Sequence, residues 1–159
     1  MRFIGDIDKR ILSEYAELFE RLRAADAISL PGVVSRDQAI EELRTANSLF
    51  LLDMTHREGY TVPAKLYEYI RVGRPILALT DMGSPTQRIL AKSGIPHTVI
   101  TKNDSDGRVD DALLNFLSLP SDPSRPSEWF EENFDGRRQA ASMAELLRSV
   151  IHREAKKDR

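Results

Sequence analysis

SLFLLDMTHREGYTVPAKLYEYIRVGRPILAL, residues 48–79, is the stretch of sequence that decides the fold. It opens with an uninterrupted apolar run, residues 48–52, which is typical of a strand buried on both faces of a parallel sheet. After a loop, Pro63 stands where proline favours a first helical turn, and Gly73 ends the helical pattern. A second buried strand, residues 75–79, follows at once. A strand, a helix and a strand in this order predict a βαβ unit with a right-handed crossover.

The same alternation continues on both sides of this unit. Two helix starts have the capping-box pattern of a serine followed three positions later by glutamine, at Ser35 with Gln38 and at Ser84 with Gln87. Further strands are expected at residues 2–5, 27–30 and 97–100, and further helices at residues 11–22, 110–119 and 140–151. The pattern predicts an α/β fold, a Rossmann-like three-layer α/β/α arrangement with a mainly parallel sheet of about five strands.

The domain organisation follows from where the pattern stops. Residues 1–120 are expected to form the Rossmann-like core. Three prolines and three serines between positions 120 and 127 predict a surface linker over residues 121–127. Residues 128–152 are interpreted as a C-terminal helical extension, and residues 153–159 as a charged tail.

Composition excludes several classes of protein. The 159-residue chain has a formal net charge of −2, so no overall positive field attracts it to nucleic acid. Its apolar runs are too short to span a bilayer, and its first residues do not have the pattern of a signal peptide. It has no cysteine, which excludes disulfides and thiolate chemistry. A cytoplasmic location is expected.

The candidate ligand site lies at the start of the helix after Pro63. Open parallel sheets bind ligands beyond the carboxyl ends of their strands, and a helix N-terminus there presents free N–H groups that suit phosphate. Lys65 adds a positive charge in the first turn, and Glu68, one turn later, could accept hydrogen bonds from ribose hydroxyls. Two alternatives remain open: Lys65 is a solvated surface lysine, or Lys65 and Glu68 form an i,i+3 ion pair.

A resemblance adds to this interpretation. PAKLYEYIRVGRPILAL, residues 63–79, resembles the donor-site helix and following strand of retaining GT-B glycosyltransferases that make bacterial cell-envelope polysaccharides. The C-terminal domain of these enzymes carries a Glu-x7-Glu pair. The similarity extends, less specifically, over nearly the whole chain, including residues 2–5, 28–34, 41–52 and 129–150.

The resemblance implies roles for particular residues. The second glutamate of the pair, which contacts the ribose, corresponds to Glu68. The first glutamate, which contacts the transferred sugar, would stand at Tyr60; either Glu58 reaches the sugar from a longer loop, or that contact is absent. The resemblance also implies that the donor is contacted by Thr61, Val62, Lys65, Gly32 and Val33.

The function implied is hexosyl transfer from a nucleoside-diphosphate sugar to a glycan or lipid-linked acceptor. Neither a metal nor another cofactor is expected, because the helix dipole and basic side chains neutralise the leaving diphosphate. The first strand and helix of the domain and the acceptor-binding domain are expected to be missing from residues 1–159. The isolated chain is therefore expected to be inactive, and the full-length enzyme to associate peripherally with the inner face of a membrane.

Two other functions are compatible with the pattern. In a phospho-receiver domain, Asp53 would be the phosphoacceptor and Thr80 and Lys102 would stand at neighbouring strand ends, with Asp6 and Asp8 as Mg²⁺ ligands. The long loop that follows Asp53 is not typical of receivers. The other alternative is a non-catalytic nucleotide-binding module. The three histidines, among them His56 in the expected donor loop, are not at metal-ligand spacing.

Overall fold

The computed structural model describes residues 1–53 and 61–157. By its internal contacts the chain divides into two compact units, Met1–Thr45 and Ala46–Arg159, a boundary that the sequence pattern did not indicate. Glu58, Tyr60 and His56 lie outside the described residues.

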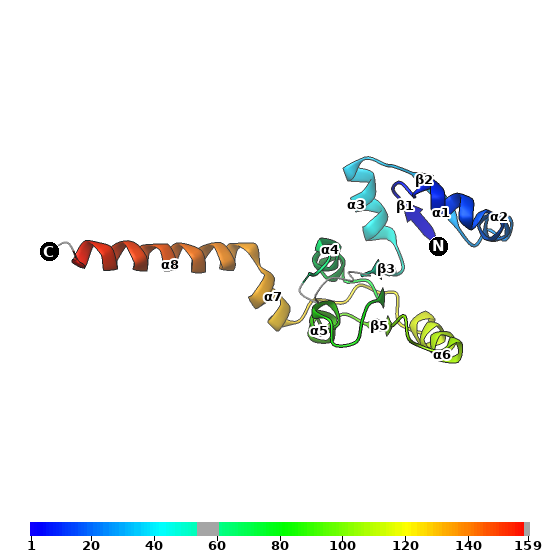
Figure 1. Ribbon diagram of the computed structural model, residues 1–159. Coiled ribbons are helices and arrows are strands. Elements are labelled where there is room, and N and C mark those ends of the chain that lie inside the picture. The colour runs from blue at the N-terminus through cyan, green and yellow to red at the C-terminus, as the bar shows by residue number, and fades with distance from the viewer. Residues whose placement is uncertain (54–60, 158–159) are drawn as a thin grey trace. The chain divides into compact units, whose positions relative to one another are not determined.

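The first unit contains two strands and three helices (Figure 1). Strands β1 (Arg2–Ile4) and β2 (Ser29–Gly32) pair in parallel, with an irregularity in register between Arg2 and Ile4. The helices are α1 (Lys9–Glu14), α2 (Ala16–Ala24) and α3 (Arg36–Thr45). Every residue of this unit keeps part of its surface exposed. The buried core of the protein therefore belongs to the second unit.

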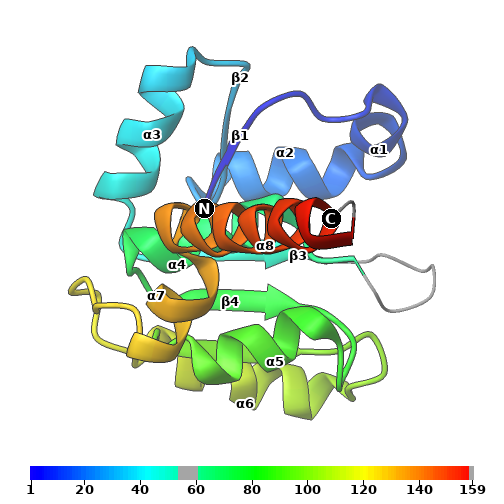
Figure 2. The ribbon, with the colours of Figure 1, turned by 90° about the vertical axis from the view of Figure 1, so that its left-hand side faces the viewer.

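The second unit contains a three-stranded parallel sheet in the order β3 (Leu49–Leu52), β4 (Ile76–Leu79), β5 (His97–Ile100). Its two ladders run in continuous register along all four residues of each strand. Figure 2 shows β3 and β4 pointing the same way. The helices of the unit are α4 (Ala64–Val72), α5 (Pro85–Lys92), α6 (Asp106–Leu117), α7 (Glu128–Phe134) and α8 (Gly136–Lys157).

Helices cover both faces of this sheet. Figure 1 shows α4 and α5 on one side of it and α6 on the other. Side chains alternate between the faces of β4. Leu77 packs in a cluster with Ile100 of β5 and Phe116 of α6, whereas Ile76 and Ala78 are fully buried on the opposite face. The expected α/β fold, with parallel strands between helical layers, is confirmed.

The structure differs from the sequence pattern in several details. The expected sheet of about five strands is present as five strands grouped into two sheets, of two and three strands. The expected helix over residues 11–22 is broken at Tyr15, where φ is −110° and ψ is 27°. Strand β2 starts two residues later than expected, because the chain turns at Asp26 with a positive φ of 52°. Helix α6 starts at Asp106 rather than position 110.

Local signals for helix ends are confirmed. Ser35 and Gln38 form the reciprocal capping box, in which each backbone N–H donates to the other side chain. Ser84 caps α5 through the N–H of Gln87, while Gln87 Oε1 accepts from the N–H of Gly83 at 2.6 Å. Gly73 ends α4 in the left-handed conformation with φ 81°.

Residues 121–127 fasten the carboxyl ends of α4 and α5. The Ser124 N–H donates to the Gly73 carbonyl at 2.9 Å, and the Ser127 N–H donates to the Ser93 carbonyl at 2.7 Å. The guanidinium of Arg74 donates to the Ser121 carbonyl at 2.5 Å. This segment is therefore attached to the helix ends at several points.

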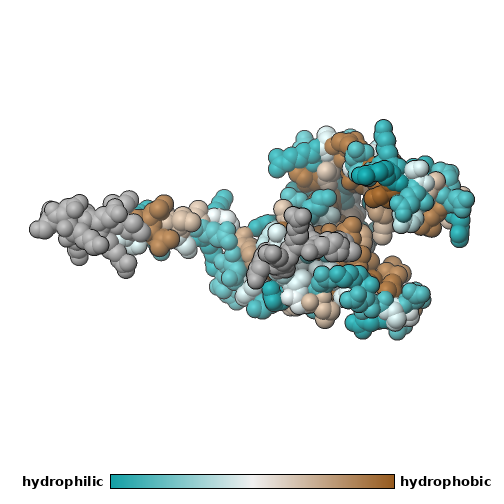
Figure 3. Space-filling model, in the orientation of Figure 1, coloured by the Kyte–Doolittle hydropathy of each residue, from teal (hydrophilic) through white to brown (hydrophobic). Residues whose placement is uncertain are grey.

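The two C-terminal helices differ in how they are packed. In α7, Phe130 is only 2% exposed, and Tyr67 of α4 lies 5.0 Å from Phe134 between ring centroids. Arg71 of α4 donates to the Phe134 carbonyl at 2.7 Å. In α8, by contrast, Met143, Leu146 and Leu147 are exposed. Figure 3 shows exposed apolar residues on the surface of this helix. No helix in the described part of the chain is long and apolar enough to cross a bilayer.

Gly94 provides a test of the attachment of residues 121–127 to the end of α5. Gly94 and Gly83 both have left-handed φ, 79° and 73°, but a Cβ at Gly94 would lie 2.9 Å from the Ser127 nitrogen, whereas nothing lies within 4 Å at Gly83. Gly83→Ala should cost about 1–2 kcal/mol of stability from backbone strain alone. Gly94→Ala should cost about 1–3 kcal/mol more, because it displaces residue 127. Urea unfolding of both variants measures the difference, and equal stabilities would contradict the attachment.

Candidate functional site

Helix α4 begins without a side-chain cap. Pro63 occupies its N-cap position and makes no side-chain hydrogen bond, and its first turn contains no acidic residue. Helices α5 and α7, by contrast, are capped by Ser84 and Ser127. The Leu66 N–H donates to the Pro63 carbonyl, but those of Ala64 and Lys65 have no acceptor in the part of the chain that the structure describes. Free N–H groups at a helix start attract anions.

Lys65 and Glu68 are exposed on the same helix. Within residues 1–53 and 61–149, whose side chains the structure describes, neither side chain forms an ion pair or a hydrogen bond. The ion pair between Lys65 and Glu68, which was one of the two alternatives, is therefore not formed. A cation in the first turn of a helix opposes the dipole by about 0.3–1 kcal/mol, so Lys65 gains no stabilisation from its own helix.

The inner side of α4 anchors the helix to the core. Leu66 and Ile70 are fully buried, and burial of side chains of this size typically contributes about 1.5–3 kcal/mol each. Tyr69 lies next to Glu68 in the sequence. Burial raises the pKa of the Tyr69 phenol, and the neighbouring Glu68 carboxylate raises it further. Tyr69 therefore stays protonated at neutral pH.

The other expected donor contacts are distributed over both units. Thr61 is exposed and Val62 is half-buried, and both directly precede α4. Gly32 and Val33 belong to the first unit, where Gly32 ends β2 with φ 79° and Val33 is 77% exposed. Thr61, Val62, Lys65 and Glu68 thus form one continuous segment of the second unit. Glu58 and Tyr60 fall outside the described residues.

A buried polar cluster lies where β3 and β4 end. The Asp53 carboxylate, in a residue only 7% exposed, accepts hydrogen bonds from the Thr80 hydroxyl at 3.1 Å and the Thr86 hydroxyl at 2.5 Å. The Thr80 hydroxyl is also 2.9 Å from that of Ser84, the cap of α5. The cluster joins the end of β3 to the start of α5. Sequence reasoning placed Asp53 and Thr80 at strand ends, in the phospho-receiver alternative, but it did not predict the hydrogen bonds to the Asp53 carboxylate or the part of Thr86.

The end of β5 has a smaller polar turn. The Thr101 N–H donates to the Asp104 carboxylate at 2.9 Å, and Arg108 Nε donates to the same carboxylate at 2.9 Å. The Thr101 N–H, more than Arg108, lowers the pKa of Asp104 below its ordinary value. Asp104 is therefore ionised at neutral pH and fixes the loop ahead of α6.

The structure shows the partners of the residues that the phospho-receiver alternative names. The Asp53 carboxylate is buried and accepts two hydroxyl hydrogen bonds. Lys102 lies 3.6 Å from Asp81. In the first unit, Asp8 caps α1 by accepting from the Arg10 N–H at 2.8 Å. Among the described residues no group of three or more histidine, aspartate or glutamate side chains is placed to hold a metal ion.

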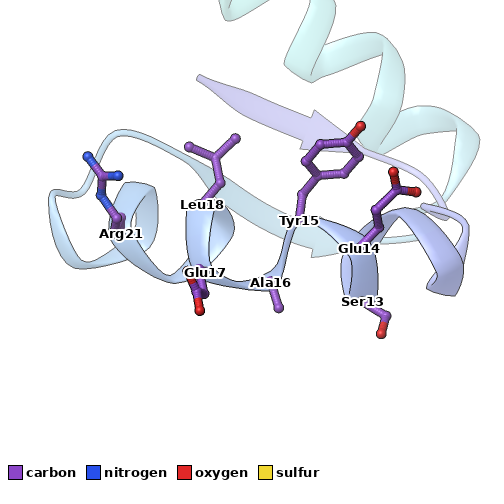
Figure 4. A pocket seen from close by; sticks show the side chains of 7 residues that line it. All are labelled: Ser13, Glu14, Tyr15, Ala16, Glu17, Leu18 and Arg21. Carbon is purple, nitrogen blue, oxygen red and sulfur yellow. The ribbon is translucent and has the colours of Figure 1, made fainter.

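A shallow hollow at the break between α1 and α2 is a weaker candidate. Figure 4 shows Tyr15 and Glu14 on one side of the ribbon and Ser13, Ala16 and Glu17 on the other. Small-molecule sites have polar groups that converge on the ligand, and these do not converge. The hollow therefore lacks the features of a ligand site.

Thr86 tests the polar cluster. Thr86→Val keeps the shape of the side chain but leaves the buried Asp53 carboxylate with one hydroxyl donor fewer, so we expect a loss of about 1–3 kcal/mol. Thr98→Val, in β5, is the control, since Thr98 makes no side-chain hydrogen bond among the described residues. Urea unfolding compares the two. If Thr86→Val is no less stable than the control, Thr86 does not contribute to the cluster.

No family model matches this chain, and the comparisons with curated proteins and with solved structures also find no match. Function has therefore to be inferred from the residues around α4 and from the sequence pattern that contains them.

Proposed function

We propose that this chain is the donor nucleotide-sugar-binding domain of a retaining GT-B glycosyltransferase. The observation that carries the proposal is the uncapped start of α4, with Lys65 and Glu68 exposed and unpaired beside it in the described structure. The resemblance of residues 63–79 to the donor-site helix of these enzymes supports it.

The diphosphate of the donor binds at the helix start. The N–H groups of Ala64 and Lys65 point along the axis of α4, where the positive end of the helix dipole favours an anion. Lys65 adds a formal positive charge in the same turn. These groups neutralise the charge that develops on the diphosphate as the sugar leaves, which is the role of preorganised donors in transfer reactions.

The ribose binds one turn further along the helix. Glu68 lies three residues after Lys65, about 4.5 Å along the axis at the usual helical rise. A carboxylate can accept two hydrogen bonds from the 2′- and 3′-hydroxyls of a ribose, as acidic residues do in other nucleotide sites. The neighbouring phenol of Tyr69 stays neutral, so it adds no second negative charge beside Glu68.

Glu68→Gln tests the ribose contact. Losing a charged acceptor from hydroxyl partners costs roughly 1.5–3 kcal/mol, so uridine or guanosine diphosphate should bind about ten- to a hundredfold more weakly. The melting temperature of the free protein should not change, because Glu68 has no partner among the described residues. Isothermal titration calorimetry measures the affinity. Glu145→Gln, at an exposed position of α8, is the matched control.

Two calorimetric outcomes would contradict the proposal. Equal affinities of wild type and Glu68→Gln would show that Glu68 does not bind the ribose. The absence of binding by any nucleoside diphosphate would show that α4 is not a donor site. Lys65→Ala should weaken binding of a nucleoside diphosphate more than binding of the nucleoside alone, because the ammonium group acts on the phosphates.

The isolated chain is expected to bind the donor without transferring sugar. GT-B sites lie between two domains, and the acceptor-binding domain of this proposal is contributed by polypeptide outside residues 1–159. Part of the donor then stays in contact with water, which weakens binding. A radiolabelled-sugar transfer assay with the 159-residue chain should give no product. Sustained turnover by this chain alone would contradict the assignment to one half of a GT-B enzyme.

A further inference from the structure

Arg71 joins the last turn of α4 to α7. Its guanidinium donates a hydrogen bond at 2.7 Å to the carbonyl of Phe134, the last residue of α7. It donates a second, at 3.4 Å, to the Tyr67 carbonyl of its own helix. The guanidinium carbon also lies 5.7 Å from the centroid of the Phe130 ring, within the range of a cation–π interaction. One side chain of α4 therefore contacts both the backbone and a buried ring of α7.

Aromatic rings extend this contact. Tyr67 of α4 lies 5.0 Å from Phe134 and 6.4 Å from Phe130, measured between ring centroids. Phe134 in turn lies 5.6 Å from Trp129, edge to face. On the side of α5, the Lys92 ammonium lies 5.1 Å from the centroid of the Trp129 ring. Helix α7 therefore contacts side chains of both α4 and α5, and all of these contacts lie within the second unit.

Helices α4 and α7 are both too short to be stable alone. α4 has nine residues and α7 has seven, whereas isolated helices below about 12–15 residues are marginal in water. The inner side of α4 is held in the core by Leu66 and Ile70. Its side that carries Tyr67 and Arg71 packs against α7. Each of the two helices therefore depends on the other for part of its stability.

We propose that α7 is a latch: its docking on α4 keeps the donor site ordered, and nucleotide binding and latch docking favour each other. This inference rests on the proposed function. The N–H groups that bind the anion are aligned only while α4 is helical. Undocking of α7 frays α4 and so lowers the fraction of molecules that can bind. Because such coupling is reciprocal, a nucleoside diphosphate bound at the start of α4 favours the docked latch.

Amide hydrogen exchange in α7 tests the coupling. Exchange is followed by NMR at residues 128–134 of the 159-residue chain, with and without saturating uridine or guanosine diphosphate, whichever binds in calorimetry. We expect exchange in α7 to slow about fivefold or more on binding, although the nucleotide is expected at the opposite end of α4. Exchange in α6, on the other side of the sheet, is the internal control and should not change (Figure 1).

Arg71 provides the variants. Arg71→Ala loses the hydrogen bond to α7, so the nucleotide should bind about three- to tenfold more weakly in calorimetry and should no longer slow exchange in α7. Arg71→Lys, whose ammonium can still donate to the Phe134 carbonyl, should restore part of both effects. Arg88→Ala is the matched control and should behave as wild type. Arg88 is exposed on α5, and its side chain forms no hydrogen bond or ion pair among the described residues.

Nucleotide binding that leaves exchange in α7 unchanged would overturn the latch, as would wild-type affinity in Arg71→Ala. If Arg71→Ala binds more weakly but the nucleotide still slows exchange in its α7, Arg71 acts on the donor site without the latch, and the proposal is wrong. If Arg71→Ala does not fold, Tyr67→Leu, which removes the ring contact and keeps Arg71, makes the same test. Absence of calorimetric binding by the wild type would instead refute the proposed donor site, and the latch with it.

Discussion

Burial of β4 on both faces is the constraint on which the second unit depends. Ile76 and Ala78 are fully buried on one face, and Leu77 packs against α6 on the other. Because β4 pairs with β3 and β5 in continuous register, it aligns the ends of all three strands. The polar residues that follow the strands therefore meet at one edge of the sheet, where open parallel sheets bind ligands. The position of every candidate group in this unit follows from that alignment.

The backbone groups at the two ends of the helices beside this sheet have different hydrogen-bond partners. At the carboxyl ends of α4 and α5, residues 121–127 satisfy the carbonyls of Gly73 and Ser93 with backbone N–H groups. At the other end, Ser84 caps α5 and belongs to the hydroxyl network that surrounds the Asp53 carboxylate. Among α4, α5, α6 and α7, both α4 and α6 start without a side-chain cap, and of these two only α4 also lacks an acidic residue in its first turn. An anion bound there would complete the hydrogen bonding of the helix start.

Sequence reasoning succeeded where the physical cause was local. The Ser35–Gln38 capping box, the stop at Gly73 and the apolar strands at residues 49–52 and 76–79 all depend on neighbouring residues. It failed where the cause was distant. Thr86 reaches Asp53 across 33 positions, and no periodicity predicts such a pair. The sequence pattern also did not predict the grouping of the strands into two sheets or the break at Tyr15. Of the candidate site, the sequence placed Thr61, Val62, Lys65 and Glu68 on one segment, but it could not distinguish an ion pair from two free side chains.

The way α4 is held explains how an exposed site can still be preorganised. Leu66 and Ile70 fix its inner side in the core, and Arg71 ties its last turn to α7 through the Phe134 carbonyl. The backbone N–H groups at its start are therefore held by the packed helix. The conformational entropy of ordering them is lost during folding and not on binding. A ligand then has to order only the long side chains of Lys65 and Glu68, at about 0.5–1.5 kcal/mol for each. In the proposed donor site, backbone donors on a packed helix with exposed charged side chains would favour recognition of a diphosphate and its ribose, and a particular sugar would be selected by residues outside α4.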